Sequence, residues 1–156
     1  MEWPEEFYAR RRGEGCPMCE QGRPDETPWG VRIQAGEVSD AYLQRADVQR
    51  GYTVVVWRGR HVAEPTELDE AEAARFWLEL LAVGRALEAH LRPVKLNYQL
   101  LGNELPHLHA HVVPRYADDP RPGWPFPFPD EERPPIDAEL YGSDVGALRS
   151  LLSFAL

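Results

Sequence analysis

Residues 107–111 read His-Leu-His-Ala-His, an alternation that restricts the conformation of this segment more than any other in the chain. In an extended strand, successive side chains point to opposite faces. The histidines are therefore expected on one face, and the apolar residues between them on the other, where they can anchor the strand in a core. His107 and His111 would stand about 13 Å apart at about 3.3 Å per residue, which is close to the length of a short polyphosphate.

The residues before the histidines predict a β-hairpin that presents them. Leu96–Leu101 reads as one strand, Gly102-Asn103 as a tight turn, and His107–Val113 as the returning strand. The alternative interpretation is a histidine-rich strand edge or a surface metal-binding tract. The hairpin is favoured because Asn97 and the turn residues accompany the histidines.

Three further strands are predicted upstream of the hairpin. Tyr52–Trp57 is β-branched and aromatic, and Val31–Gln34 and Glu37–Leu43 form a shorter pair joined around Gly36. Together with the hairpin they make a sheet of about five strands. Mostly short connections favour an antiparallel sheet with helices packed on one face, which is an α+β fold.

One long helix and one short helix are predicted. A capping signal at Thr66–Asp69 begins the long helix, which runs to His90–Leu91 and stops before Pro93. His90 is expected to be solvated near the helix end, and the short C-terminal helix is expected from Asp144 onward. Apolar residues at three- and four-residue spacings are expected to face the core: Ala73, Phe76, Trp77, Leu80, Leu81, Leu87 and Leu91.

Two segments lack a regular pattern. Residues 1–30 are rich in Gly, Pro and charge and read as an irregular arm with one helical turn near Glu5–Arg10. Residues 117–137 form a proline-rich loop. The length of 156 residues suits a single domain spanning residues 1–156.

Composition narrows the class of protein. The acidic N-terminus does not resemble a signal peptide, and no stretch approaches the roughly 20 apolar residues that span a bilayer, so a cytoplasmic protein without a membrane partner is expected. The net charge of −9 argues against non-specific binding of a nucleic-acid polymer. A small anionic ligand remains compatible, because local donors can bind it in an acidic protein.

The two cysteines are spaced Cys16-x-x-Cys19. In a cytosolic chain this spacing indicates metal or redox chemistry rather than a structural disulfide. Thioredoxin-like redox activity would require a βαβ pattern around the pair, which the flanking Gly-, Pro- and Arg-rich segments do not show. Zinc binding is favoured over free thiols and over redox activity.

At these residues the chain resembles the histidine triad (HIT) superfamily of nucleotide hydrolases and transferases, and in particular bacterial HIT proteins similar to diadenosine polyphosphate hydrolases. The signature alternates histidine with apolar residues and is present as His107-Leu-His-Ala-His-Val-Val113. The resemblance extends over residues 16–115 and includes Cys16-Pro-Met-Cys19, Gly59-Arg60-His61-Val62, Asn97 and Gly102-Asn103. It implies the HIT-like α+β fold and a homodimer in which two sheets join edge to edge.

The middle histidine is the candidate nucleophile. A neutral imidazole attacks phosphorus near pH 7 if one nitrogen is free and the other donates to a fixed acceptor. His109 occupies the middle position, and the resemblance assigns it this role. His111 is expected to donate to the phosphate or leaving group as a general acid, which makes His109 and His111 the predicted catalytic residues.

Several residues are candidates for substrate contacts. The resemblance places amide donors near Asn97 and Asn103, although Asn103 also suits the turn after Gly102. Arg115 either screens phosphate or lies on the surface. Among residues of the early strands, Tyr42 is expected to contact the substrate, and Val31, Ile33 and Leu43 are expected to join it in a base pocket. Trp124, Phe126 and Phe128 either stack on a base or partner subunit, or pin their loop to the surface.

The resemblance also implies a structural zinc site. In several HIT branches the first histidine of the triad joins two cysteines and an upstream histidine around zinc. The corresponding residues here are Cys16, Cys19, His61 and His107, a closed set of four nitrogen and sulfur ligands.

The favoured function is a nucleotide phosphoanhydride or phosphoramidate hydrolase that acts on the α-phosphate, through a nucleotidyl-histidine intermediate, on dinucleoside polyphosphates. One alternative is a nucleotidyltransferase or dinucleoside polyphosphate phosphorylase; His111 favours hydrolysis, because the transferase branch often has Gln at this position. A non-catalytic nucleotide-binding protein and a zinc-dependent structural module are further alternatives, and neither requires His109.

Overall fold

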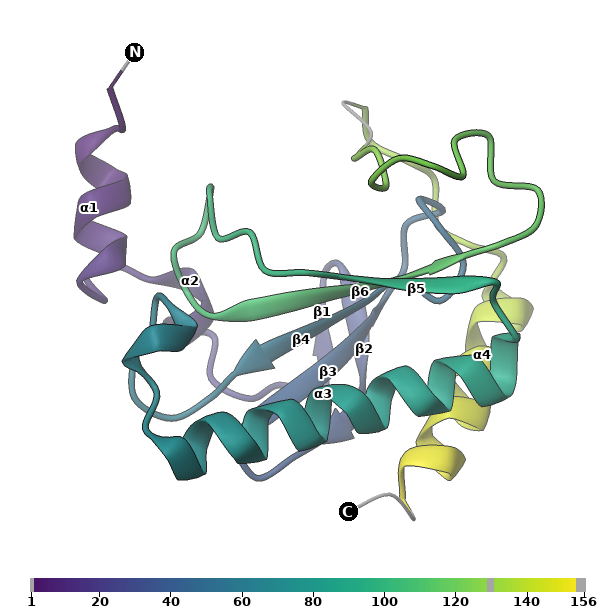
Figure 1. Cartoon of the computed structure of the whole chain (residues 1–156), viewed down its shortest axis with the longest axis horizontal. Coiled ribbons are helices and arrows are strands. Elements are labelled where there is room, and N and C mark those ends of the chain that lie inside the picture. Colours follow the sequence, from purple (N-terminus) through teal and green to yellow (C-terminus); the bar gives the residue numbers. More distant parts are fainter. Residues whose placement is uncertain (1, 129–130, 154–156) are drawn as a thin grey trace.

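The computed structural model describes residues 2–128 and 131–153, which form a six-stranded sheet covered by helices (Figure 1). The strand order is β1-β2-β3-β4-β6-β5, and every pairing is antiparallel. The predicted α+β fold is confirmed, with one strand more than the expected five because β1 is too short to leave a periodic pattern. The strands are β1 (Glu26–Thr27), β2 (Gly30–Ala35), β3 (Ser39–Gln44), β4 (Thr53–Trp57), β5 (Lys95–Gln99) and β6 (His109–Arg115).

Two helices pack on the same face of the sheet: α3 (Glu70–Leu91) and α4 (Ala138–Leu152) (Figure 1). The main core lies between them and the strands. Asp69 caps α3 by accepting a hydrogen bond from the Glu72 backbone, directly after a 3-10 turn at Pro65–Glu67. The predicted start and end of the long helix are therefore confirmed.

The alternation in β6 divides its side chains as predicted. Leu108, Ala110 and Val112 are buried in the helix-covered core. His109 lies opposite Val56 of β4 and His111 opposite Val54, on the other face of the sheet. The histidines are therefore held on the face opposite α3 and α4 by the register of β6 against β4.

The predicted antiparallel pairing of the two strands is confirmed, but the tight turn between them is wrong. β5 ends at Gln99 and β6 begins at His109, so residues 100–108 form a long connection instead of a two-residue turn at Gly102-Asn103. His107 lies outside β6, because Leu108 already exchanges backbone hydrogen bonds with Val62 and Trp57. These loop contacts replace the ladder that the sequence pattern suggested.

The two main helices also differ from the sequence predictions. α4 begins at Ala138 and not at Asp144, because Asp137 caps it by accepting from the Leu140 backbone, while glycines within the helix weaken its sequence pattern. Trp77 and Leu81 of α3 are 45% and 38% exposed and do not join the core.

The N-terminal arm is more ordered than expected. It contains α1 (Glu5–Arg11), which confirms the predicted helical turn, and the single-turn helix α2 (Pro17–Glu20). The arm ends with β1, so residues 1–30 as a whole are not irregular. Pro17 favours α2 because its fixed φ and missing N–H suit the first helical position.

A buried carboxylate holds this arm against the sheet. Asp40 of β3 is fully buried and accepts from Arg23 at 2.8 Å, from Arg58 at 2.9 Å and from Arg32 at 3.4 Å. Arg58 in turn donates to the backbone oxygen of Met18 at 2.8 Å. The charge of Asp40 is thus compensated, and the segment around Met18 is fixed beside the histidines.

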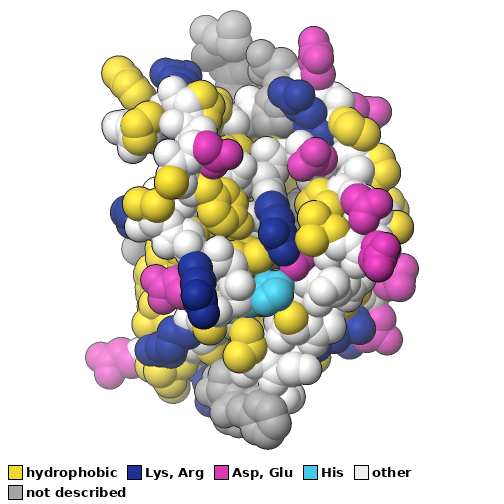
Figure 2. Space-filling view, turned by 90° about the vertical axis from the view of Figure 1, so that its right-hand side faces the viewer, with side chains coloured by type: hydrophobic (Ala, Val, Ile, Leu, Met, Phe, Trp, Pro, Cys, Tyr) yellow, Lys and Arg dark blue, Asp and Glu magenta, His cyan; other side chains and the backbone are white. Residues whose placement is uncertain are grey.

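The surface shown in Figure 2 carries basic and acidic side chains that are intermingled with hydrophobic ones. The exposed Arg50 forms an ion pair with the buried Asp144, which also accepts from His90 at 2.8 Å. His90 is therefore bonded to α4 rather than simply solvated. Among the described helices, none has the length and apolar character needed to cross a membrane.

A second buried carboxylate joins α3 to the turn between β2 and β3. Glu79 is fully buried and accepts from the backbone N–H groups of Glu37 at 2.7 Å and Val38 at 3.2 Å. Arg75 donates to the same carboxylate at 3.1 Å. A Cβ atom at Gly36 would lie 2.2 Å from the Glu79 carboxylate, so this approach requires glycine.

We expect Glu79→Gln to lower the free energy of unfolding by about 2–4 kcal/mol, because the amide group cannot accept from all of the same donors and leaves Arg75 with Glu37 as its remaining acidic partner, at 3.2 Å. Urea denaturation measures this change. The matched control is Glu88→Gln at an exposed position of the same helix, which should change stability by less than about 0.5 kcal/mol. Equal stability of the two variants would show that Glu79 does not hold the turn.

Candidate functional site

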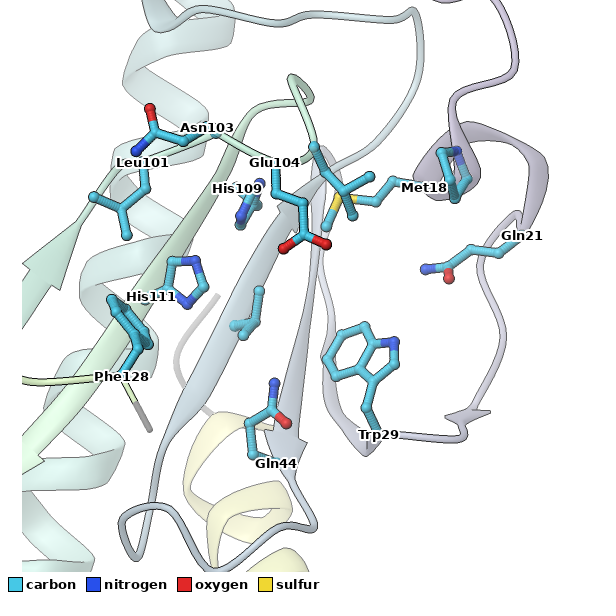
Figure 3. A pocket seen from close by; sticks show the side chains of 14 residues that line it. Met18, Gln21, Trp29, Gln44, Leu101, Asn103, Glu104, His109, His111 and Phe128 are labelled. Atoms are coloured by element: carbon cyan, nitrogen blue, oxygen red, sulfur yellow. The ribbon is translucent and has the colours of Figure 1, made fainter. Parts of the chain in front are cut away.

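The site is a cavity of about 440 Å³ on the face of the sheet opposite α3 and α4 (Figure 3). His109 and His111 of β6 form part of its wall, and the connection before β6 contributes Asn103. The remaining lining residues are Pro17, Met18, Gln21, Trp29, Gln44, Val54, Leu101, Gly102, Glu104, Leu105 and Phe128.

One part of the cavity is apolar and suits a flat ring. Met18 and Trp29 lie there (Figure 3), and Val54 and Leu105 belong to the same apolar cluster. The polar groups of the histidines and Asn103 lie along β6 and the connection that precedes it. Apolar walls with a few directed polar groups are typical of small-molecule sites. No Lys or Arg is among the described lining residues, so any anion would be held by neutral donors.

His109 has one nitrogen tied to the backbone. Its Nδ1 lies 2.6 Å from the backbone oxygen of His107, and because a carbonyl oxygen only accepts, Nδ1 carries the proton. Nε2 therefore holds a lone pair. Burial lowers the pKa of His109 below its usual value, which keeps this imidazole neutral near pH 7.

His111 is bonded through its Nδ1 as well, but to a hydroxyl. The Tyr52 hydroxyl oxygen lies 2.6 Å from this nitrogen. Burial, together with the nearby His109, lowers the pKa of His111 to about 4. The two rings lie 4.9 Å apart at an angle of 66°, so one phosphate group can reach both.

Four side chains converge next to His107, just before the start of β6. The Sγ atoms of Cys16 and Cys19 each lie 3.5 Å from Nδ1 of His107, and Sγ of Cys19 lies 3.3 Å from Nδ1 of His61. All four potential ligand atoms lie within 4.8 Å of one another. Zinc bonds of about 2.0 to 2.3 Å in a tetrahedron place nitrogen and sulfur about 3.5 Å apart, which these distances match.

Both histidines of this cluster present an unprotonated Nδ1. Nε2 of His107 donates to the backbone oxygen of Trp57 at 2.8 Å, and Nε2 of His61 donates to that of Arg11 at 3.2 Å. Such bonds fix the nitrogen that faces a metal. Burial raises the pKa of the Cys19 thiol to about 11, unlike the low pKa of a redox-active cysteine. The cluster fits a divalent cation.

Other predicted site residues lie elsewhere. Tyr42 is buried beneath Trp29, with ring centroids 5.3 Å apart, and its hydroxyl donates to the backbone of Pro24. Val31, Ile33 and Leu43 lie in the core under the helices and not in a base pocket. The prediction of a base pocket failed because it assumed that these side chains of β2 and β3 face an open side of the sheet, whereas both faces of β3 are buried.

Asn97 and Arg115 bind each other outside the cavity. Arg115 is 6% exposed and donates to the Asn97 side chain at 2.6 Å, so it neither lies on the surface nor faces a phosphate. It also donates to the Asp119 carboxylate and to the backbone oxygens of Arg121 and Trp124. Arg115 thereby fixes the start of the proline-rich segment.

The aromatic residues of that segment have separate positions. Trp124 is 64% exposed, Phe126 packs against Tyr52, and Phe128 lines the cavity beside His111. Residues 129–130 of the predicted loop lie outside the described part of the chain.

Sequence reasoning missed Tyr52, Met18, Trp29 and Gln44 as neighbours of the histidines. Tyr52 shares the β4 face of Val54 and Val56, which the alternation of Tyr52–Trp57 already indicates. The sequence does not give the register of β4 against β6. The alternation in residues 52–57 therefore could not show that Tyr52 lies next to His111.

The HIT domain profile matches residues 31–118. A histidine triad protein from Bradyrhizobium japonicum is 28% identical, with a TM-score of 0.68 over 79% of this chain and 90% of that one. A zinc-bound histidine triad family protein from Mycobacterium smegmatis has a TM-score of 0.59 at 21% identity, over 88% and 91% of the two chains. The Protein hit of Bacillus subtilis is 24% identical over 109 residues, which cover 67% of this chain and 73% of that protein. The profile match covers more than half of the chain and includes His61, His107, His109 and His111, and the chain belongs to the HIT domain family.

Proposed function

We propose that this protein hydrolyses dinucleoside polyphosphates at the α-phosphate through a covalent intermediate on His109. The observation that carries the proposal is the hydrogen bond from Nδ1 of His109 to the His107 backbone oxygen. It leaves the lone pair of Nε2 on the cavity side of a neutral, buried imidazole, which is the arrangement that a nucleophile at phosphorus needs.

The reaction divides into two displacements. Nε2 of His109 forms a bond to the α-phosphorus while the bond to the bridging oxygen breaks, and the electron pair leaves with the oxygen of the nucleoside polyphosphate. Water then attacks the same phosphorus, and the electron pair of the phosphorus–nitrogen bond returns to Nε2 of His109. The nucleoside monophosphate is released together with one proton from the water. His111 and Asn103 stabilise the charge on the phosphate oxygens as hydrogen-bond donors.

The cavity accommodates the rest of such a substrate. Trp29 and Met18 offer apolar surface for a base, and Gln44 and Gln21 offer amide groups at its edge. Glu104 is the only acidic side chain among the described lining residues and lies at the exposed connection before β6. The polyphosphate would therefore leave the cavity along His111 and Asn103, away from the base.

A nucleotidyltransferase or phosphorylase remains the second candidate, because the same intermediate can be transferred to phosphate in place of water. A nucleotide-binding protein without turnover is a third possibility, but it gives no role to the free Nε2 of His109.

We expect wild-type protein to convert diadenosine tetraphosphate into AMP and ATP, and His109→Ala to lose at least about 10³-fold of this activity. Chromatographic product analysis measures both. His90→Ala is the matched control, since His90 contacts Asp144 and does not line the cavity.

The same assay with added inorganic phosphate separates the two enzymatic candidates. Formation of ADP and ATP only when phosphate is present would replace the hydrolase by a phosphorylase. Unchanged activity of His109→Ala would contradict both.

We further propose that Cys16, Cys19, His61 and His107 hold a structural zinc ion. The matching distances and the two fixed histidine tautomers support it, and the related protein from Mycobacterium smegmatis is zinc-bound. With four protein ligands the ion would have no open position, so it would fasten the arm to the residue before β6 and take no part in the chemistry.

We expect about one zinc ion per chain by elemental analysis, and loss of zinc in Cys19→Ser. His109→Ala is the matched control and should retain zinc while losing turnover. Chelation should lower the thermal midpoint of wild type but leave Cys19→Ser unchanged. A metal content that does not respond to Cys19→Ser would refute this site.

A homodimer is proposed from the free edge of the sheet. β5 is an edge strand, and Tyr98 on it is 40% exposed. The Tyr98 side chain approaches Gly84 of α3. Leu81 and Trp77 are exposed on the same helix, one and two turns before Gly84, so that Tyr98, Leu81 and Trp77 form one apolar strip. A second copy can cover the strip while pairing its own β5 with the unpaired backbone groups.

We expect light scattering to give twice the chain mass of 17.8 kDa for wild type. Trp77→Glu should shift the protein toward the monomer, because it places a charge in the apolar strip. Leu140→Glu, at an exposed position of α4, is the control and should remain dimeric. A monomeric wild type would exclude this interface.

A further inference from the structure

The Tyr52 hydroxyl is a buried polar group next to the triad with no role so far. Tyr52 is 5% exposed and precedes β4. Its oxygen lies 2.6 Å from Nδ1 of His111, and the two rings are nearly perpendicular, at 89°. No other described group is within hydrogen-bonding distance of this hydroxyl.

Aromatic rings of the proline-rich segment shield this hydrogen bond. Phe126 and Phe128 both pack edge-on against Tyr52, with ring centroids 6.3 Å away in each case. Phe128 also contacts the His111 ring at 5.6 Å, and Figure 3 shows the two side by side. Burial raises the pKa of Tyr52 well above its usual value, so the hydroxyl keeps its proton.

The direction of the hydrogen bond follows from where the hydroxyl proton can go. If Nδ1 of His111 carried a proton and donated it, the Tyr52 proton would be buried without an acceptor among the described residues, at a cost in free energy. Donation from Tyr52 to Nδ1 satisfies both groups. Nε2 of His111 then carries the other proton and faces the cavity.

We propose that Tyr52 is a positioning residue that holds His111 as the neutral Nε2–H tautomer, and that this tautomer makes the site selective for leaving groups that depart as oxyanions. This inference rests on the proposed function and narrows its substrate class to phosphoanhydrides, as opposed to phosphoramidates. His109 and His111 thus have opposite tautomers, one with Nε2 as nucleophile and the other with Nε2–H as donor.

The selectivity follows from what a neutral imidazole can do. It stabilises a developing negative charge through its N–H, but full transfer of that proton would leave an imidazolate, or a tyrosinate if Tyr52 supplied a second proton. Both anions are costly in this buried site. When an anhydride bond breaks, the electron pair passes to a phosphate oxygen that is stable without a proton. When a phosphorus–nitrogen bond breaks, the departing nitrogen must receive a proton from an acid.

Nitrogen-15 spectra of the histidine side chains test the tautomer without any turnover. The wild type is expected to show His111 protonated at Nε2, and Tyr52→Phe to show a mixture of both tautomers with the fold unchanged. Tyr116→Phe is the matched control, because its hydroxyl donates to the Arg50 backbone and not to a histidine. A wild-type His111 protonated at Nδ1, or one that Tyr52→Phe does not alter, would overturn the proposal.

Kinetics with two substrates of one nucleoside test the selectivity. The wild type should cleave diadenosine tetraphosphate with kcat/KM at least about 10²-fold above that for adenosine 5′-phosphoramidate. Tyr52→Phe should lower kcat for the anhydride about tenfold with KM changed less than about twofold. Tyr52→Phe should also lower the ratio of kcat/KM for the anhydride to kcat/KM for the phosphoramidate. Without the Tyr52 hydroxyl, Nδ1 of His111 can bind a proton from solvent, and the ring can then donate a proton to the departing nitrogen.

The outcomes separate this inference from the proposed function. Equal turnover of the two substrates by wild type would overturn the selectivity and leave the hydrolase intact. Turnover of neither would overturn the hydrolase and the selectivity together, while the spectra would still decide whether Tyr52 fixes His111.

Discussion

The site depends on how each imidazole is tied to the protein through one nitrogen. Nε2 of His107 and Nδ1 of His109 both donate to backbone oxygens, and Nδ1 of His111 lies against the Tyr52 hydroxyl. Each ring therefore presents its other nitrogen in one defined state. That state suits a metal ligand at His107 and, as we propose, a nucleophile at His109 and a donor at His111. The three residues thus differ in chemistry although the sequence alternates them regularly.

The fold supplies these hydrogen-bond partners by placing rigid elements around β6. The β4 register sets Tyr52 and Val54 beside His111, and the helix-covered core anchors the intervening apolar residues. Buried carboxylates hold the remaining parts: Asp40 fixes the arm through Arg58, and Glu79 fixes the β2–β3 turn. The cavity itself has no Lys or Arg among its described lining residues. Neutral donors that are fixed in advance are consistent with charge stabilisation in the transition state rather than tight binding of substrate.

Local patterns predicted the main elements, but not the contacts between distant segments. The alternation at residues 107–113 and the capping signal before α3 gave the facing of the histidines and the start of the long helix. The cysteines and two histidines predicted as a zinc set do converge. The tight turn between β5 and β6 and the start of α4 were predicted wrongly, because loop hydrogen bonds decide the first and the Asp137 cap decides the second. Tyr42 does not line the cavity, because both faces of β3 are buried. Arg115 bonds to Asn97 on β5, and Tyr52 bonds to His111 on β6. Such contacts between strands cannot be predicted from a local sequence pattern.

The most direct test of the central claim is to trap the covalent intermediate. Wild-type protein is mixed with diadenosine tetraphosphate, denatured at alkaline pH within the first turnover, and examined by intact mass and peptide mapping. The account predicts a transient adduct of one nucleoside monophosphate per chain, attached to His109. Complete turnover without any adduct, or an adduct on another residue, would contradict nucleophilic attack by His109.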